Sequence, residues 1–156
     1  MNRIFCLLLS MVLFAGCDEN RIYEEFVTLP PYWHLNDAKE FEFEIESDST
    51  SYDLVAQFKQ DIDFPNSNFY FMYRLKDESD EILEEHLNEI VFFEPKTGKP
   101  LGSGIGDTFD NELVLAENYQ FPTAGTYKIA LRQFMRVDSI PGILRVGVRI
   151  EQSAAN

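Results

Sequence analysis

Cys17 is the residue of this chain whose surroundings point most directly to a covalent modification. It follows two small residues at the end of an apolar run, residues 4–14, and Arg3 lies before that run. A basic start, an apolar core and a small-residue cleavage site are the three parts of an export signal. A cysteine directly after that site predicts a lipoprotein signal that is cleaved before Cys17, with a diacylglycerol on the Cys17 sulfur.

The expected anchor and the fate of the thiols follow from this signal. Each buried methylene contributes about 0.8 kcal/mol, so two or three acyl chains hold a protein on a membrane almost permanently. A secretory signal without lipid is the alternative, whereas an apolar run shorter than ~20 residues disfavours a retained membrane span. Because Cys6 would leave with residues 1–16 and Cys17 would be acylated, the mature chain is expected to contain no disulfide.

The side chains that could act as bases at neutral pH are His34 and His86. Neither belongs to a His-Glu-x-x-His zinc pattern or lies near a Gly-x-Ser-x-Gly elbow. Two carboxylates could hydrolyse a glycosidic bond, but with 27 acidic residues some close pair is inevitable in any fold. We therefore expect a protein that is not an enzyme and that uses no cofactor.

Two polar loops contain residue types that bind ligands in other proteins. Residues 102–107 hold three glycines before an aspartate, but no Lys-Ser or Lys-Thr follows as in a phosphate-binding loop. A tight turn with positive φ explains these glycines better. Residues 61–68 offer aspartate and asparagine oxygens, but they lack the central glycine and terminal glutamate of a calcium loop. We expect neither a nucleotide site nor a metal site here.

Aromatic rings offer a possible binding surface for sugars. Trp33, Tyr32 and Tyr70 are candidates for such a platform, because ligand sites are often lined by aromatic side chains. Packing in the core or at a strand edge is the other interpretation, and it is the commoner fate of large rings. The sequence favours packing and leaves carbohydrate binding as an alternative function.

Four arginines are concentrated near the end of the chain, at positions Arg132, Arg136, Arg145 and Arg149. Residues four apart in a strand lie on the same face, so each pair is expected to share a face. Arginine forms charge-assisted hydrogen bonds with carboxylates, which are abundant here. Pairing inside the domain is favoured over pairing across an interface.

Strands are the elements expected to position these side chains. Alternation of apolar and polar residues is the signature of a half-buried strand. It occurs in residues 41–45, 52–59, 126–134 and 144–150.

Four other segments are predicted on less regular patterns. Residues 69–75 contain no acidic residue and predict a strand buried on both faces. Residues 90–94 and 112–116 predict short strands. Residues 81–87 are predicted as a strand after a turn, with an amphipathic helix over residues 76–88 as the alternative.

Length and composition indicate one folded domain. Removing residues 1–16 from the 156 residues leaves 140, which fits a single domain, and the 14 Phe and seven Tyr favour strands. Seven or eight short strands without repeats predict an all-β fold, an antiparallel β-sandwich of the jelly-roll or immunoglobulin-like kind. Residues 17–31 are predicted to be the lipidated N-terminus and a spacer, of which a few residues could add to a sheet edge. Residues 32–156 are predicted to form the domain.

The formal net charge of −14 limits the range of partners. An acidic surface repels nucleic-acid phosphates, which excludes a nucleic-acid role. The acidity either keeps a tethered domain soluble or matches a basic partner.

Short motifs follow the export signal in a definite order. They are Trp33 with Asn36-Asp37, Phe41 with Phe43, Tyr52, the loop 64–68, the glycines of 102–107, Gly125 with Tyr127, Gln133 with Met135-Arg136, and Gly142-Ile143 followed by Val146-Gly147. In this order and spacing, over nearly the full length, the chain resembles the GldH-type gliding motility lipoproteins.

The resemblance implies a lipid-anchored protein of the cell envelope, expected in the outer membrane, that is not an enzyme. It also implies contact with other envelope proteins of the gliding and associated protein-secretion machinery, or with another copy of the chain. No catalytic, cofactor-binding or metal-binding residue is carried over from the family. The alternative function is a surface carbohydrate-binding lipoprotein.

Overall fold

The computed structural model describes residues 20–154, which form an antiparallel β-sandwich as predicted. These residues contain no helix that could cross a membrane. The strands are β1 Arg21–Thr28, β2 Tyr32–His34, β3 Lys39–Ile45, β4 Tyr52–Asp61, β5 Asn68–Lys76, β6 Ile82–Val91, β7 Ser103–Ile105, β8 Thr108–Tyr119, β9 Gly125–Gln133, β10 Ser139–Pro141 and β11 Ile143–Gln152.

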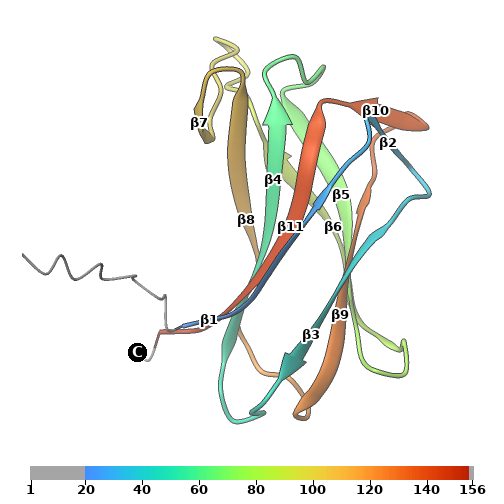
Figure 1. The fold of residues 1–156 in the computed structure, drawn as a ribbon, viewed down its shortest axis with the longest axis vertical. Helices are drawn as coiled ribbons and strands as arrows, with labels where there is room; N and C mark the ends of the chain where they lie inside the picture. Colours follow the sequence, from blue (N-terminus) through green and yellow to red (C-terminus); the bar gives the residue numbers. More distant parts are fainter. Residues whose placement is uncertain (1–19, 155–156) are drawn as a thin grey trace, which may run out of the picture.

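Two sheets form the layers of the sandwich (Figure 1). The five-stranded sheet has the order β1-β11-β4-β8-β7, and the four-stranded sheet has the order β3-β9-β5-β6. Strands β10 and β2 form a small ribbon at one end, where Ile140 lies opposite Trp33. Neighbours such as β1 and β11 are far apart in sequence, so the strand order comes from long-range pairing.

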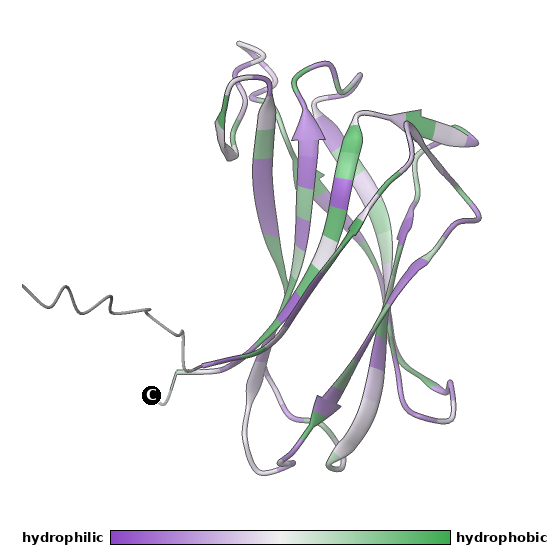
Figure 2. Cartoon of the chain, in the orientation of Figure 1, coloured by the Kyte–Doolittle hydropathy of each residue, from purple (hydrophilic) through white to green (hydrophobic). Residues whose placement is uncertain are grey.

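The core lies between the two sheets and is rich in aromatic rings. Alternation places one side of each strand inward, and Figure 2 shows this alternation along β4, β8 and β11. Phe58 packs against Phe71 with ring centroids 4.8 Å apart and against Phe69 at 5.4 Å. The largest fully buried aromatic side chains are Trp33, Tyr52, Tyr73, Phe41, Phe58, Phe69, Phe71 and Phe92.

Strand β1 occupies most of the segment that was predicted as a spacer. Arg21 lies opposite Glu151 and Thr28 opposite Arg145, with a bulge after Arg21. The sequence allowed a few residues to join a sheet edge, but here eight residues do so. Strand pairing therefore begins at Arg21, not near residue 32, and it was missed because the partner strand β11 is at the other end of the chain.

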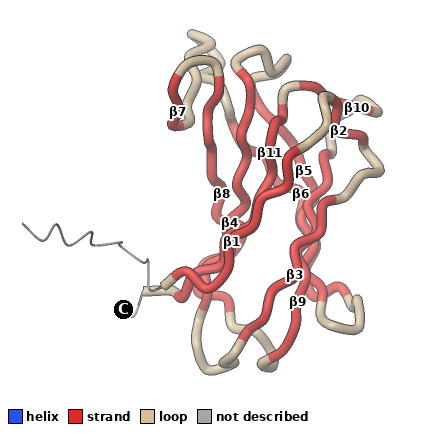
Figure 3. Tube along the Cα trace, in the orientation of Figure 1, coloured by secondary structure: helices blue, strands red, loops and turns tan. Residues whose placement is uncertain are grey.

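Three other strand predictions need correction. The segment 69–75 is not buried on both faces, because its side chains alternate between the core and a half-buried outer face. Of the predicted segment 81–87, residues 82–87 do form a strand, but it continues through Val91 as the single strand β6. The predicted segment 112–116 is the middle of β8, which has 12 residues. Figure 3 shows the remaining chain as loops gathered at the two ends of the sandwich.

Candidate functional site

Trp33 does not belong to an exposed aromatic platform, which overturns that part of the sugar-binding hypothesis. Its side chain is 0% exposed, and its Nε1 donates a hydrogen bond to the Asp37 carbonyl oxygen at 2.6 Å. The ring packs against Phe69 with centroids 5.9 Å apart. Tyr32 is exposed on the other side of β2, whereas Tyr70 lies on β5, so the three rings do not form one surface.

The two polar loops are stabilised by their own hydrogen bonds and backbone packing. Asp61 accepts a hydrogen bond from the Asp63 backbone at 2.9 Å, and residues 20–154 contain no cluster of three or more side chains suited to a metal. In the 102–107 segment only Gly106 has a positive φ, +75°. Gly104 is required for a different reason, because a Cβ there would lie 2.1 Å from the Thr108 carbonyl oxygen.

His34 and His86 lie on different elements and do not form a shared site. His34 is exposed on β2. His86 is exposed on β6, where its ring stacks on Tyr73 with centroids 6.2 Å apart and its Nε2 lies 3.9 Å from a Glu84 oxygen. Ser139 lies directly opposite His34 in the β2–β10 ribbon, but in the described part of the chain no hydrogen bond joins the two side chains.

Two of the four arginines pair inside the domain, as favoured from the sequence. Arg149 donates to both oxygens of Glu112, at 2.6 and 2.8 Å, across the five-stranded sheet. These bonds hold the pKa of Glu112 below its usual range. Arg145 donates to Asp110 at 3.3 Å, and its guanidinium lies 4.0 Å from the centre of the Phe26 ring. This network lies on the outer face of the five-stranded sheet.

The candidate site is a groove on the outer face of the four-stranded sheet, with a volume of about 470 Å³. Strands β5 and β6 form its floor, and the loop between β9 and β10 forms a wall. Three of its apolar side chains are well exposed: Leu87 at 53%, Val137 at 50% and Phe134 at 40%. The full lining is Asn66, Tyr70, Leu87, Phe134, Met135, Arg136 and Val137.

The buried side chain of Gln133 holds the loop that forms the groove wall. Its Oε1 accepts a hydrogen bond from the Met135 backbone N–H at 2.8 Å, and its Nε2 donates to the Val137 carbonyl oxygen at 3.3 Å. Two further bonds tie the loop to β5: Phe134 N–H donates to the Tyr70 carbonyl oxygen at 2.8 Å, and the Tyr70 N–H lies 3.2 Å from the Met135 sulfur. The wall is therefore preorganised by the body of the sandwich.

The groove has a positive rim in an acidic protein. Arg136 lines it, and the Arg132 guanidinium lies 5.5 Å from the centre of the Phe134 ring. The nearby Glu89 accepts a hydrogen bond from Asn68 at 2.6 Å. Hydrogen bonding to Glu89 raises the pKa of Tyr70, and the charge of Arg136 opposes that rise. The Glu89 carboxylate is thus hydrogen-bonded to Asn68 and Tyr70, and within the described residues it forms no ion pair with either arginine.

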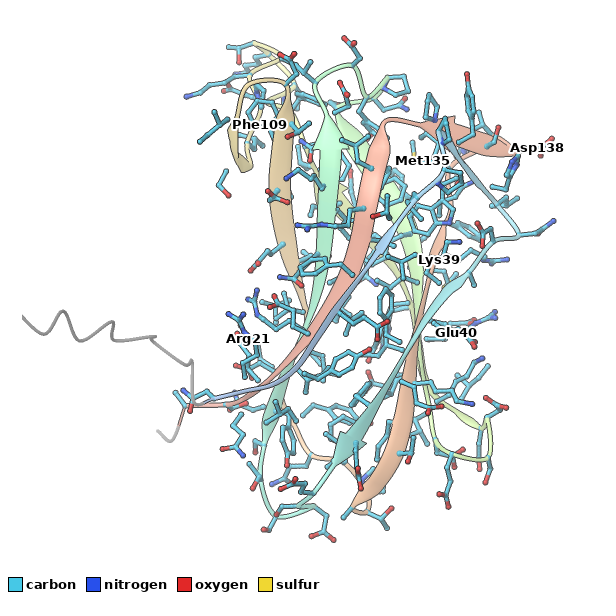
Figure 4. All side chains as sticks on the ribbon, in the orientation of Figure 1. Arg21, Lys39, Glu40, Phe109, Met135 and Asp138 are labelled. Carbon is cyan, nitrogen blue, oxygen red and sulfur yellow. The ribbon has the colours of Figure 1, made fainter. Side chains whose placement is uncertain are left out.

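The groove and the start of β1 lie at opposite ends of the sandwich. Figure 4 shows Met135 and Asp138 at the upper right and Arg21 at the lower left. The chain direction gives the same result. Strand β4 runs from the end near Arg21 to the other end, where β5 begins and where Tyr70 lines the groove.

A sequence model described as GldH lipoprotein matches residues 21–150, the span from the first strand to the last. The chain belongs to the GldH lipoprotein family. Among curated proteins, a "Gliding motility lipoprotein GldH homolog" of Christiangramia forsetii is 29% identical, covering 96% of this chain and 95% of that one. The "Gliding motility lipoprotein GldH" of Flavobacterium johnsoniae is 26% identical, covering 94% of each chain.

Among solved structures, this GldH-family chain is similar to a non-crystalline cellulose specific carbohydrate-binding module. The TM-score is 0.46 and the identity 14%, over 85% of this chain and 75% of the module.

Most of the groove residues of this GldH-family protein were not singled out from the sequence. Tyr70 was considered for a sugar platform and Arg136 for ion pairing, but Leu87, Phe134 and Val137 were not considered as site residues. Their signal is weak, because an apolar residue on the outward side of a strand looks like ordinary surface. Cys17 lies outside the described residues, so its lipidation stays a prediction.

Proposed function

We propose that this chain is a lipid-anchored envelope protein that acts by protein contact, as a component of the gliding motility and associated protein-secretion machinery. Membership in the GldH family and the names of the two curated relatives support the machinery. The contact role rests on the groove, because exposed apolar side chains around a preorganised cavity are typical of a surface that another molecule covers. No catalytic residue enters the proposal.

Cys17 is the proposed site of lipid attachment, and its spacing from β1 limits how the domain can stand on a membrane. Four residue steps separate Cys17 from Arg21. At up to about 3.6 Å per residue, this tether spans at most ~14 Å. A tether this short replaces the longer spacer expected from the sequence. The end near Arg21 would face the membrane, and the groove would face away from it.

The outer membrane is the proposed location, on the strength of the family resemblance. The single domain is proposed to extend from the first strand through β11. Carbohydrate binding becomes the weaker alternative, because the buried Trp33 cannot present its ring to a sugar.

Photo-crosslinking in native envelopes tests the contact role. A photoreactive phenylalanine analogue replaces Phe134 in the groove, and a matched control places it at Val114, an exposed apolar position on β8 of the other sheet. The proposal expects position 134 to capture gliding or secretion proteins and position 114 to capture few. Equal capture at both positions, or capture of unrelated proteins alone, would contradict it.

A further inference from the structure

The rim charge of the groove has no partner of its own within the described chain. In residues 20–154, neither Arg132 nor Arg136 forms an ion pair with a carboxylate, whereas Arg145 and Arg149 both do. The formal net charge of the protein is −14, so carboxylates are plentiful. Two guanidinium groups without a carboxylate partner in the described chain lie beside this groove, against one carboxylate, Glu89, which is bonded to Asn68. The arginines therefore favour negative charge in the occupant.

The floor and wall of the same groove are apolar. Leu87 and Val137 are each about half exposed, and Phe134 adds an aromatic face. The volume of about 470 Å³ lies within the ~300–1,000 Å³ of typical ligand pockets. A suitable occupant must have a large apolar group, which is removed from water when it enters the groove. It must also have carboxylates that reach the rim.

The position of the groove favours a protein segment as the occupant. Leu87 lies on β6, the edge strand of the four-stranded sheet, whose outer side is available for an extended chain. Membrane lipid is disfavoured because the groove is at the end away from Arg21, where the tether begins. A neutral sugar would leave both guanidinium groups without a charged partner.

We infer that the groove binds an extended segment of a partner protein in which acidic side chains flank a large apolar one. This inference rests on the proposed contact function and names the chemistry of the contact. The apolar side chain lies between Leu87, Phe134 and Val137. The flanking carboxylates pair with Arg136 and Arg132.

A peptide-display selection on the full lipidated chain in nanodiscs tests the chemistry directly. The probe is a library of short peptides with a central phenylalanine and random flanking positions. Asp and Glu should be enriched in the flanks. Enrichment of Lys and Arg, or of no residue type, would overturn the inference.

Charge reversal in the protein then identifies the rim. Arg136→Glu should weaken binding of the selected peptide roughly tenfold, as expected for reversing one exposed charge at an interface. Arg132→Glu should act in the same direction. The matched control is Lys96→Glu, which makes the same charge change in the turn after β6, outside the groove lining. If this control weakens binding as much as Arg136→Glu, net charge and not the rim explains the effect, and the inference fails.

A variant of the floor separates charge from apolar contact. Leu87 is exposed, so Leu87→Ser should keep the fold, which far-UV circular dichroism verifies, while weakening binding about fivefold. Unchanged binding would overturn the assignment of the groove. If the selection fails while crosslinking at position 134 still captures motility proteins, the contact function stands and only the acidic chemistry is wrong. If peptides bind but position 134 captures nothing, the proposed function fails independently.

Discussion

Gln133→Leu should loosen the groove wall without unfolding the sandwich. Leucine fills much of the same space but can neither accept the Met135 N–H nor donate to the Val137 carbonyl. The first bond, at 2.8 Å, is worth about 1 kcal/mol, and the second, at 3.3 Å, is worth less. Met135 is half-buried, so its unpaired N–H adds part of a desolvation cost. We expect the free energy of opening the loop to fall by about 2 kcal/mol in total.

Amide hydrogen exchange measures this loss at two amides that form no hydrogen bond with the Gln133 side chain. Phe134 N–H donates to the Tyr70 carbonyl oxygen, and Leu35 N–H donates to the Asp138 carbonyl oxygen. Both hydrogen bonds are 2.8 Å long. A loss of about 2 kcal/mol corresponds to roughly 30-fold faster exchange through local opening. Both amides should exchange faster by this factor. The exchange rates of amides in the centre of β4 should change only as much as the change in global stability predicts.

Gln60→Leu is the matched control, because Gln60 is also fully buried but lies on β4 and bonds Asn111 at 2.5 Å. Gln60→Leu should lower global stability, and it should not raise the exchange rates of the groove-loop amides more than those of the core amides. If Gln133→Leu changes the exchange of Phe134 and Leu35 by less than about threefold, the wall is held by other contacts and the reasoning is refuted.

Three further perturbations are expected to have defined outcomes. Gly147→Ala should lower the free energy of unfolding by about 1–3 kcal/mol, because a Cβ would lie 2.4 Å from a ring carbon of Phe26 and 2.8 Å from the Glu25 carbonyl oxygen; an unchanged urea midpoint would show that strand β1 shifts at little cost. The pKa of Glu112 is depressed in the folded state, so its pairing stabilises the fold above the ordinary pKa of 4.5 and is lost as the pH falls through the lower folded value. Arg149→Gln should therefore reduce the loss of stability on acidification, as followed by urea unfolding at a series of pH values, and an identical pH profile would argue against this pairing. Cys17→Ser should abolish labelling by radioactive palmitate, whereas normal labelling would disprove lipidation at that residue.

Local alternation predicted several strands well. The segments 41–45, 126–134 and 144–150 correspond to β3, β9 and β11, because one face of each strand packs in the core and the other meets solvent. The same rule failed for β1, whose charged and apolar residues do not alternate cleanly. Its place at the sheet edge depends on hydrogen bonds to β11, which no local pattern reports.

The candidate site was harder to predict than the strands that carry it. Gln133 and Met135-Arg136 appeared in the motifs of the family resemblance, but their spacing does not reveal that Gln133 holds the loop. That role requires a buried side chain to meet two backbone groups in the next turn of the chain. The exposure of Leu87 likewise depends on its side chain pointing to the outer face of the four-stranded sheet, which neither of the other sheets of the described residues covers.

By itself, the sequence determined the all-β class, the predicted export signal with Cys17, and the acidic surface. These properties depend on composition and on residues close together in the chain. Only the tertiary structure decided which arginines find partners on other strands. Arg149 lies on β11, within reach of Glu112 on β8, whereas Arg132 lies opposite Met72. The four arginines look alike in sequence, but an ion pair depends on the neighbouring strands, and their order is set by long-range packing.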